Sequence, residues 1–147
     1  EKMRELTKYY FNPKSCTYHY LHMAKGNYRD YLQTDLVRVK KYFYVLRPIL
    51  ACKWIESMGT MAPMEFEKLV NTQIENPELK KEIEKLLERK KSGEELDKET
   101  RIGIINEFVE KQIEYFEKKV EDYNKNFKPE TEKLDKLFRE TLNEVWK

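Results

Sequence analysis

The sequence predicts an all-α protein, a compact helical bundle of about six to seven helices with a long central helix that is kinked near Pro48. Only 4 of the 147 residues are glycine, and 5 are proline. No alternating apolar and polar run of strand length occurs, and apolar residues recur at spacings of three and four along most of the chain. With 39% hydrophobic and 38% charged residues, the chain has the length and composition of a single domain with one core.

Proline pairs mark where several helices begin. Asn12-Pro13 and Asn76-Pro77 each combine a helix-capping side chain with a proline at the first helical position, where the missing N–H costs nothing. Lys128-Pro129 indicates a third start with a weaker cap. Inside the long helix, Pro48 removes the hydrogen bond to the carbonyl of Tyr44, which is the reason to expect a bend there.

The first half of the chain reads as four helices and a short connecting piece. Gly26-Asn27 predicts the end of the second helix, and the stretch from Gly59 to Pro63 predicts the end of the long one. We therefore expect helices over residues 1–11, 13–25, 36–58 and 64–72, with a short piece over 28–33.

The second half predicts three more helices with charged outer faces. We expect the first of them to end before Ser92-Gly93, and Asp97 or Thr100 to cap the next, which is about 25 residues long. The apolar stripes that face the core are Leu79, Ile83, Leu86 and Leu87, then Ile105, Val109, Ile113, Phe116, Val120 and Tyr123, and finally Leu134, Phe138, Leu142 and Val145. A coiled-coil or partner-binding use of the last two helices stays an open alternative.

Charge and aromatic residues are distributed unequally. Residues 1–63 carry 11 Lys and Arg against 5 Asp and Glu, whereas residues 64–147 carry 18 against 22. The first 63 residues also hold eight of the ten tyrosines. Such a mixture suits contact with phosphates and bases, and it equally suits tyrosines at the rim of a core. We therefore divide the single domain, 1–147, into a basic and aromatic part over 12–70 and an acidic packing part over 76–147.

Several functions lack their sequence signatures. The chain has no GxGxxG, GxxxxGK[ST], GxSxG or HExxH motif. Cys16 and Cys52 lie in apolar tracts without ligand spacing, which predicts two small buried side chains in a reducing cytoplasm. His19 and His22 have no further ligands near them, so we predict neither a metal site nor a catalytic residue in this chain. No apolar run is long enough to span a bilayer, and we expect no membrane partner.

Two polar stripes stand out as a candidate binding site. One lies on the second helix, and the other lies on the long helix about 80° away from its core stripe. Because the rest of the long helix is apolar, we expect it to be buried nearly all round, so that its cations need a partner. That partner is either a carboxylate of the second half or an anionic ligand, and we predict one common cleft for both stripes. The stripes comprise Ser15, Tyr18, His22 and Lys25, and Lys40, Tyr44 and Arg47.

Four segments carry a resemblance to a known family. They are NPKSCTYHYLHMAKGNYRDYL (12–32), VKKYFYVLRPILACKWIE (39–56), GTMAPMEFEKLV (59–70) and, more loosely, KEIEKLLERKKSGEELD (81–97). Together they resemble the carboxy-terminal half of a bacterial family of predicted nucleotidyltransferases in the DNA polymerase beta superfamily, the YcgL or RlaP type.

The resemblance implies a two-part enzyme. In this superfamily an amino-terminal α/β palm carries a Gly-Ser turn and carboxylates that hold two divalent metals, and a helical half closes over the nucleotide. This chain has no Gly-Ser turn and no Asp-x-Asp, so we expect the catalytic palm domain and its Mg²⁺ to lie outside it. The chain alone is then expected to be inactive.

The resemblance further implies a helical substrate-binding domain. The full-length enzyme would transfer a nucleotidyl group from a nucleoside triphosphate to an unknown acceptor, RNA or another molecule. Residue type, helical angle and this analogy nominate seven nucleotide-binding residues: Tyr18, His22, Lys25, Lys40, Lys41, Tyr44 and Arg47. The other expected partner is the protein's own palm domain. The alternative is a nucleic-acid-binding or protein-interaction module without an enzymatic role.

Overall fold

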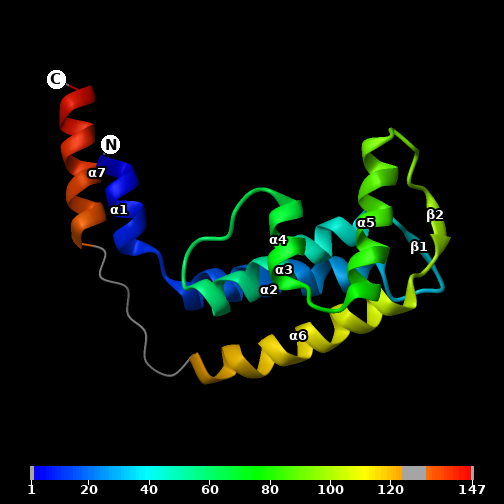
Figure 1. Cartoon of the computed structure of the whole chain (residues 1–147). Helices are drawn as coiled ribbons and strands as arrows, with labels where there is room; N and C mark the ends of the chain where they lie inside the picture. Colours follow the sequence, from blue (N-terminus) through cyan, green and yellow to red (C-terminus); the bar gives the residue numbers. More distant parts are fainter. Residues whose placement is uncertain (1, 124–131, 147) are drawn as a thin grey trace.

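The computed structural model describes residues 2–123 and 132–146, which form seven helices and one two-stranded sheet (Figure 1). The fold class predicted from the sequence is confirmed, because helices make up most of these residues. In chain order the elements are α1 (Lys2–Tyr10), α2 (Pro13–Tyr31), β1 (Leu36–Arg38), α3 (Lys41–Met58), α4 (Phe66–Gln73), α5 (Pro77–Lys91), β2 (Lys98–Thr100), α6 (Gly103–Tyr123) and α7 (Glu132–Val145).

Helix α3 is the centre of the fold. It continues as one helix through Pro48, and Leu46, Ile49 and Leu50 are completely buried. Helix α2 lies along it, α4 and α5 pack on another side, and α6 runs across the opposite side (Figure 1). Buried side chains of these helices form two hydrophobic clusters. The larger one contains side chains of all five helices and the smaller one lies around Cys52 and Phe116. The core therefore surrounds α3 on most of its circumference, as its apolar sequence predicts.

Both Asn-Pro helix starts are confirmed. The Asn12 side chain accepts hydrogen bonds from the main-chain N–H of Lys14 and Ser15, and the Asn76 side chain accepts from those of Glu78 and Leu79. These bonds satisfy main-chain donors that have no partner inside the helix. The third predicted start, at 128–129, lies outside the described residues.

Replacing Asn76 by alanine is expected to lower the free energy of unfolding by about 1 kcal/mol, because two donors in the first turn of α5 lose their acceptor. Urea denaturation measures this loss. Asn71→Ala is the control, since Asn71 is exposed in α4 and its side chain caps no helix. Equal stability of the two variants would contradict the capping role.

The predicted helix over 36–58 begins later than expected, because residues 36–38 form a strand. β1 pairs antiparallel with β2, and Leu36 lies opposite Thr100. Val37 is buried between two exposed neighbours, which is the alternation of a strand, but three residues are too few to reveal it in a sequence. Asp97 and Thr100 do not cap α6: Thr100 lies in β2, and the Asp97 carboxylate accepts from the N–H of Lys98.

Helix α2 is longer than predicted and runs through Gly26 and Asn27 to Tyr31. Ala24 and Tyr28 lie on its buried face on either side of Gly26. The Asn27 side chain, which often ends a helix, donates here to the main-chain oxygen of Met23 at 3.0 Å. Packing thus outweighs the weak helix propensity of these two residues. The extension places Tyr31 beside the start of α3.

None of the helices within the described ranges is both long enough and apolar enough to cross a membrane.

Candidate functional site

The stripe of Lys40, Tyr44 and Arg47 lies on the one exposed edge of α3. All three side chains are exposed, and Tyr44 retains 55% of its accessible surface. The expectation that α3 is buried nearly all round is confirmed, but the expectation that its cations are buried is wrong, because α2, α4 and α6 leave this edge uncovered. Its cations are in contact with solvent and do not need a buried carboxylate.

Arg47 connects α3 to the segment that precedes α4. Its Nη1 donates to the main-chain oxygen of Met64 at 2.6 Å, and its guanidinium carbon lies 5.5 Å from the centre of the Phe66 ring. Neither contact neutralises the charge of the guanidinium. The sequence predicted either a protein carboxylate or a ligand as the partner of Arg47. The partner in the structure is instead a main-chain carbonyl at the surface.

Lys41 lies between two exposed tyrosines. Its Nζ is 4.2 Å from the centre of the Tyr31 ring and 4.6 Å from that of the Tyr44 ring. An ammonium group over an aromatic face is attracted by the ring quadrupole, but at an exposed position this contact is worth only about 0.5 to 1 kcal/mol. A stronger ligand could therefore displace Lys41 and take its place against the two rings.

Two further cations lie over aromatic rings of α3, one at Trp54 near its end and one at the buried Phe43. Lys68 of α4 lies over Trp54, and Lys90 of α5 lies over Phe43, which in turn packs edge-on against Phe66. We call this surface the basic-aromatic face. It consists of the cations Lys40, Lys41, Arg47, Lys68 and Lys90 and the rings of Tyr31, Phe43, Tyr44, Trp54 and Phe66.

The electrostatics of the basic-aromatic face favour an anion. Within the described residues, none of its five cations has a carboxylate at ion-pair distance. Lys40 also occupies the N-cap of α3 without a capping side-chain bond, and the first turn of this helix contains no acidic residue. The positive end of the helix dipole therefore adds to the charge of Lys40 and Lys41 instead of being compensated.

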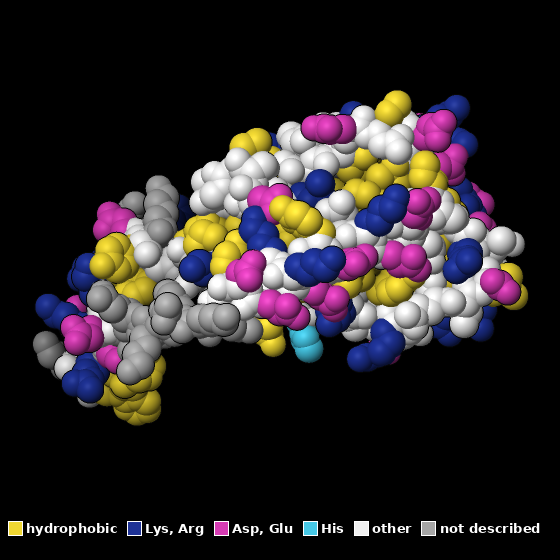
Figure 2. Space-filling model, turned by 90° about the horizontal axis from the view of Figure 1, so that it is seen from below, with side chains coloured by type: hydrophobic (Ala, Val, Ile, Leu, Met, Phe, Trp, Pro, Cys, Tyr) yellow, Lys and Arg dark blue, Asp and Glu magenta, His cyan; other side chains and the backbone are white. Residues whose placement is uncertain are grey.

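The surface around α6 has a different character. Lys111 and Lys118 each pair with a glutamate four residues earlier, and Lys119 pairs with Glu56 of α3. Figure 2, which views the molecule from below, accordingly shows basic and acidic side chains mixed over this side. Such a surface has no net preference for an anionic partner.

Of the stripe on α2, Lys25 lies against α6, whereas Ser15, Tyr18 and His22 are exposed. Lys25 pairs with Glu117 of α6 at 2.5 Å, and the rings of Tyr18 and His22 stack with their centres 6.4 Å apart. Lys25 also lines a groove of about 380 Å³ between α2 and α6, together with Glu110 and other glutamates. The predicted common cleft is therefore wrong for Lys25, which lies against α6, whereas Arg47 lies against the segment before α4. A nucleotide-binding role of Tyr18, His22 and Lys25 stays a prediction.

Tyr28, on the wall of this groove, is buried and donates its hydroxyl hydrogen to Glu110. Burial, followed by this contact, raises its pKa to about 12.

The folded protein therefore holds the Tyr28 proton more tightly than the unfolded chain, in which the pKa is near 10. The stability that this provides is fully present below pH 10 and is lost as the pH rises toward 12. We expect the stability difference between the wild type and Tyr28→Phe to be constant from pH 7 to 9 and to shrink by pH 12, measured by urea unfolding. A difference that stays constant to pH 12 would contradict this assignment.

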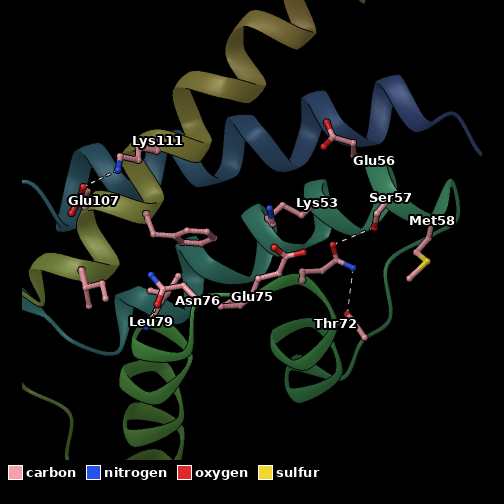
Figure 3. A pocket seen from close by; sticks show the side chains of 14 residues that line it. Lys53, Glu56, Ser57, Met58, Thr72, Glu75, Asn76, Leu79, Glu107 and Lys111 are labelled. Carbon is pink, nitrogen blue, oxygen red and sulfur yellow. Dashed lines mark hydrogen bonds and ion pairs between the residues drawn. The ribbon is translucent and has the colours of Figure 1, made fainter.

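A second groove, of about 570 Å³, lies between the end of α3, the α4–α5 connection and the start of α6 (Figure 3). Several of its polar groups bond to one another: Gln73 bonds to Ser57 and Thr72, and Lys111 pairs with Glu107. None of the seven predicted site residues lines it. This groove therefore adds no group to the candidate site.

The cysteines and the acidic residues do not indicate a reactive centre. Burial raises the pKa of Cys52 to about 12, so its thiol stays protonated, and Cys16 is half-buried with a pKa that burial also raises. Within residues 2–123 and 132–146, no three His, Cys, Asp or Glu side chains come close enough together to hold a metal ion.

Six of the ten residues of the basic-aromatic face were not predicted from the sequence as site residues. Tyr31 joins it only because α2 continues past Gly26, and Trp54 is a core residue in the sequence-based interpretation. Lys68 and Lys90 belong to helices whose charges read as ordinary solvated faces. The one usable signal for Tyr31, Trp54 and Lys68 is the mixture of cations and rings over residues 12–70, which does not single out individual positions, and the sequence gives no signal for Lys90.

Comparison with known proteins agrees with the resemblance of the four segments. The model of the family RlaP, described as "RNA repair pathway DNA polymerase beta family", matches residues 1–140. The chain is 49% identical over 147 residues to a protein of Bacillus subtilis (strain 168) called "Uncharacterized protein YcgL". It spans about half of that relative's length, 56%, while the match covers all of this chain. No solved structure matches. A family match over nearly the entire length, together with this identity, shows that the chain belongs to the RlaP family of the DNA polymerase beta type.

Proposed function

We propose that this chain is the helical, substrate-binding half of a nucleotidyltransferase that transfers a nucleotidyl group from a nucleoside triphosphate to an acceptor, with RNA as the favoured acceptor. The single observation that carries the proposal is the basic-aromatic face. Among the described residues, none of its five cations has a carboxylate at ion-pair distance, and four of them, Lys41, Arg47, Lys68 and Lys90, lie over aromatic rings. Family membership supports it, because the family description names RNA repair and DNA polymerase beta.

Cations without a carboxylate partner suit phosphates, and exposed rings suit bases. Lys41 and Arg47 would neutralise phosphate oxygens, while Tyr31 and Tyr44 would stack on a base or on the ribose. From Lys40 to Arg47 the exposed edge at the start of α3 extends about 10 Å, at 1.5 Å per residue. This length accommodates either a triphosphate with its base or a few nucleotides of a single strand.

The metal ions of such an enzyme do not fit the described residues, which contain no suitable cluster of ligands. We therefore assign the metal ligands and the nucleotide transfer itself to the remaining part of the full-length protein. In the proposal, this chain contributes the binding and orientation of the substrate.

The full-length protein tests the proposal directly. It is incubated with Mg²⁺, α-labelled nucleoside triphosphates and an acceptor panel that includes RNA 3′ ends, RNA 5′ phosphates and protein. We expect label on an RNA end, and we expect Lys41→Gln and Arg47→Gln each to raise the KM for one substrate about tenfold, which corresponds to one lost phosphate contact.

Lys118→Gln on α6 is the matched control, because it removes an exposed cation that already pairs with Glu114. It should leave KM unchanged. Transfer that is equally insensitive to Lys41, Arg47 and Lys118 would show that the basic-aromatic face is not the substrate surface. RNA binding without transfer to any acceptor would favour the alternative of a binding module.

A further inference from the structure

Helix α7 has an apolar stripe that stays exposed among the described residues. None of its residues is buried. Leu134, Phe138, Leu142 and Val145 recur at spacings of four and three, so they lie on one face of the helix, and Phe138 retains 65% of its accessible surface. Trp146 follows directly and is 82% exposed. A row of large apolar side chains in water is unusual for a helix of a soluble domain and marks an interaction surface.

Helix α1 extends the same surface. It lies beside α7, and the pair stands apart from the body formed by α2 to α6 (Figure 1). The N–H of Lys133 donates to the Tyr10 hydroxyl at 3.0 Å, and the Lys133 ammonium lies 3.8 Å from the centre of the Tyr9 ring. These contacts are polar or cation–π, and Met3 and Tyr9 stay largely exposed. The two helices together therefore leave apolar surface of both uncovered.

The length of the relative indicates what covers this surface. The match leaves a little under half of the Bacillus subtilis protein outside this chain, which is enough residues for a further domain. The first and last described residues both lie at the α1–α7 pair (Figure 1). Additional chain at either end would therefore begin next to the apolar face, and a covalently attached domain has a high effective concentration there.

We propose that the apolar face of α1 and α7 is the docking surface for the rest of the full-length protein. Phe138 and Leu142 of α7 and Met3 of α1 would be its apolar contacts. This inference does not depend on the reaction that the protein catalyses. A failure of the transfer assay and a failure of this docking surface are therefore separate results.

Photo-crosslinking in the full-length protein tests the proposal. Phe138→p-benzoylphenylalanine places a photoreactive group in the apolar stripe, and mass spectrometry identifies the peptide to which it crosslinks. We expect a peptide from outside residues 1–147 of the same molecule. Asn143→p-benzoylphenylalanine, on the opposite side of α7, is the matched control and should give at least tenfold less of that product.

Mixing isotopically labelled and unlabelled protein before irradiation distinguishes one molecule from two. A crosslink between two copies would overturn the proposal and assign the surface to a dimer. A crosslink only to α2–α6, equal crosslinking from positions 138 and 143, or no crosslink at all would overturn it as well. If the modified side chain prevents folding, hydrogen exchange is measured on the unmodified full-length protein instead. The proposal requires that the main-chain N–H groups of α7 exchange slowly. Exchange as fast as in an isolated helix would refute it.

Discussion

Replacing Asn106 by alanine is expected to lower the free energy of unfolding by about 2 to 4 kcal/mol, because two buried polar groups lose a partner at once. Asn106 is 4% exposed. Its amide nitrogen donates to the main-chain oxygen of Leu32 at 2.8 Å, and its amide oxygen accepts from the Tyr42 hydroxyl. That hydroxyl also accepts from the N–H of Ile102 at 2.8 Å. One side chain of α6 thus joins the end of α2 to α3.

Urea denaturation of Asn106→Ala measures this loss, and Asn27→Ala is the matched control. The Asn27 side chain also donates to a main-chain oxygen, but within its own helix and at a less buried position, so its loss should cost less than about 0.5 kcal/mol. Tyr42→Phe should behave like Asn106→Ala, and the double variant should lose less than the sum because the two groups share one bond. Full additivity, or a loss below 1 kcal/mol, would show that this network does not hold the helices together.

Neutralising Lys41 and Arg47 together is expected to weaken RNA binding of the full-length protein about 10- to 100-fold at moderate salt. Two cations without carboxylate partners would lose their contacts with phosphates, and the slope of log affinity against log salt should become shallower by about 1.4. The thermal midpoint should hardly change, because both side chains lie at the surface. Fluorescence anisotropy with a labelled single-stranded RNA over a series of salt concentrations measures both effects.

The double variant Lys111→Gln/Lys118→Gln is the matched control, since it removes the same charge from α6, where each lysine already pairs with a glutamate. Tyr44→Phe and Tyr44→Ala then separate stacking from hydrogen bonding: stacking predicts that only the alanine variant binds more weakly. Equal salt slopes for the Lys41/Arg47 and Lys111/Lys118 variants would contradict the assignment of the RNA surface to the basic-aromatic face.

The sequence by itself determined the features that depend on neighbouring residues. Asn12 and Asn76 act within three positions along the chain, so the two helix starts were predictable from local rules. The apolar periodicity of α3 made it the central helix, because burying that many apolar side chains requires neighbours on most sides. The surplus of cations and tyrosines before residue 64 likewise indicated which half of the molecule carries the candidate site.

Only the tertiary structure decided what depends on residues far apart in the sequence. β1 is a strand because it pairs with β2, some 60 residues later, and α2 continues through Gly26 because both sides of that glycine bury neighbouring side chains. For the same reason the sequence could not tell which edge of α3 stays uncovered. That edge is defined by where α2, α4 and α6 pack. Their packing places Tyr31 and Lys90 beside the α3 stripe and directs Lys25 toward Glu117.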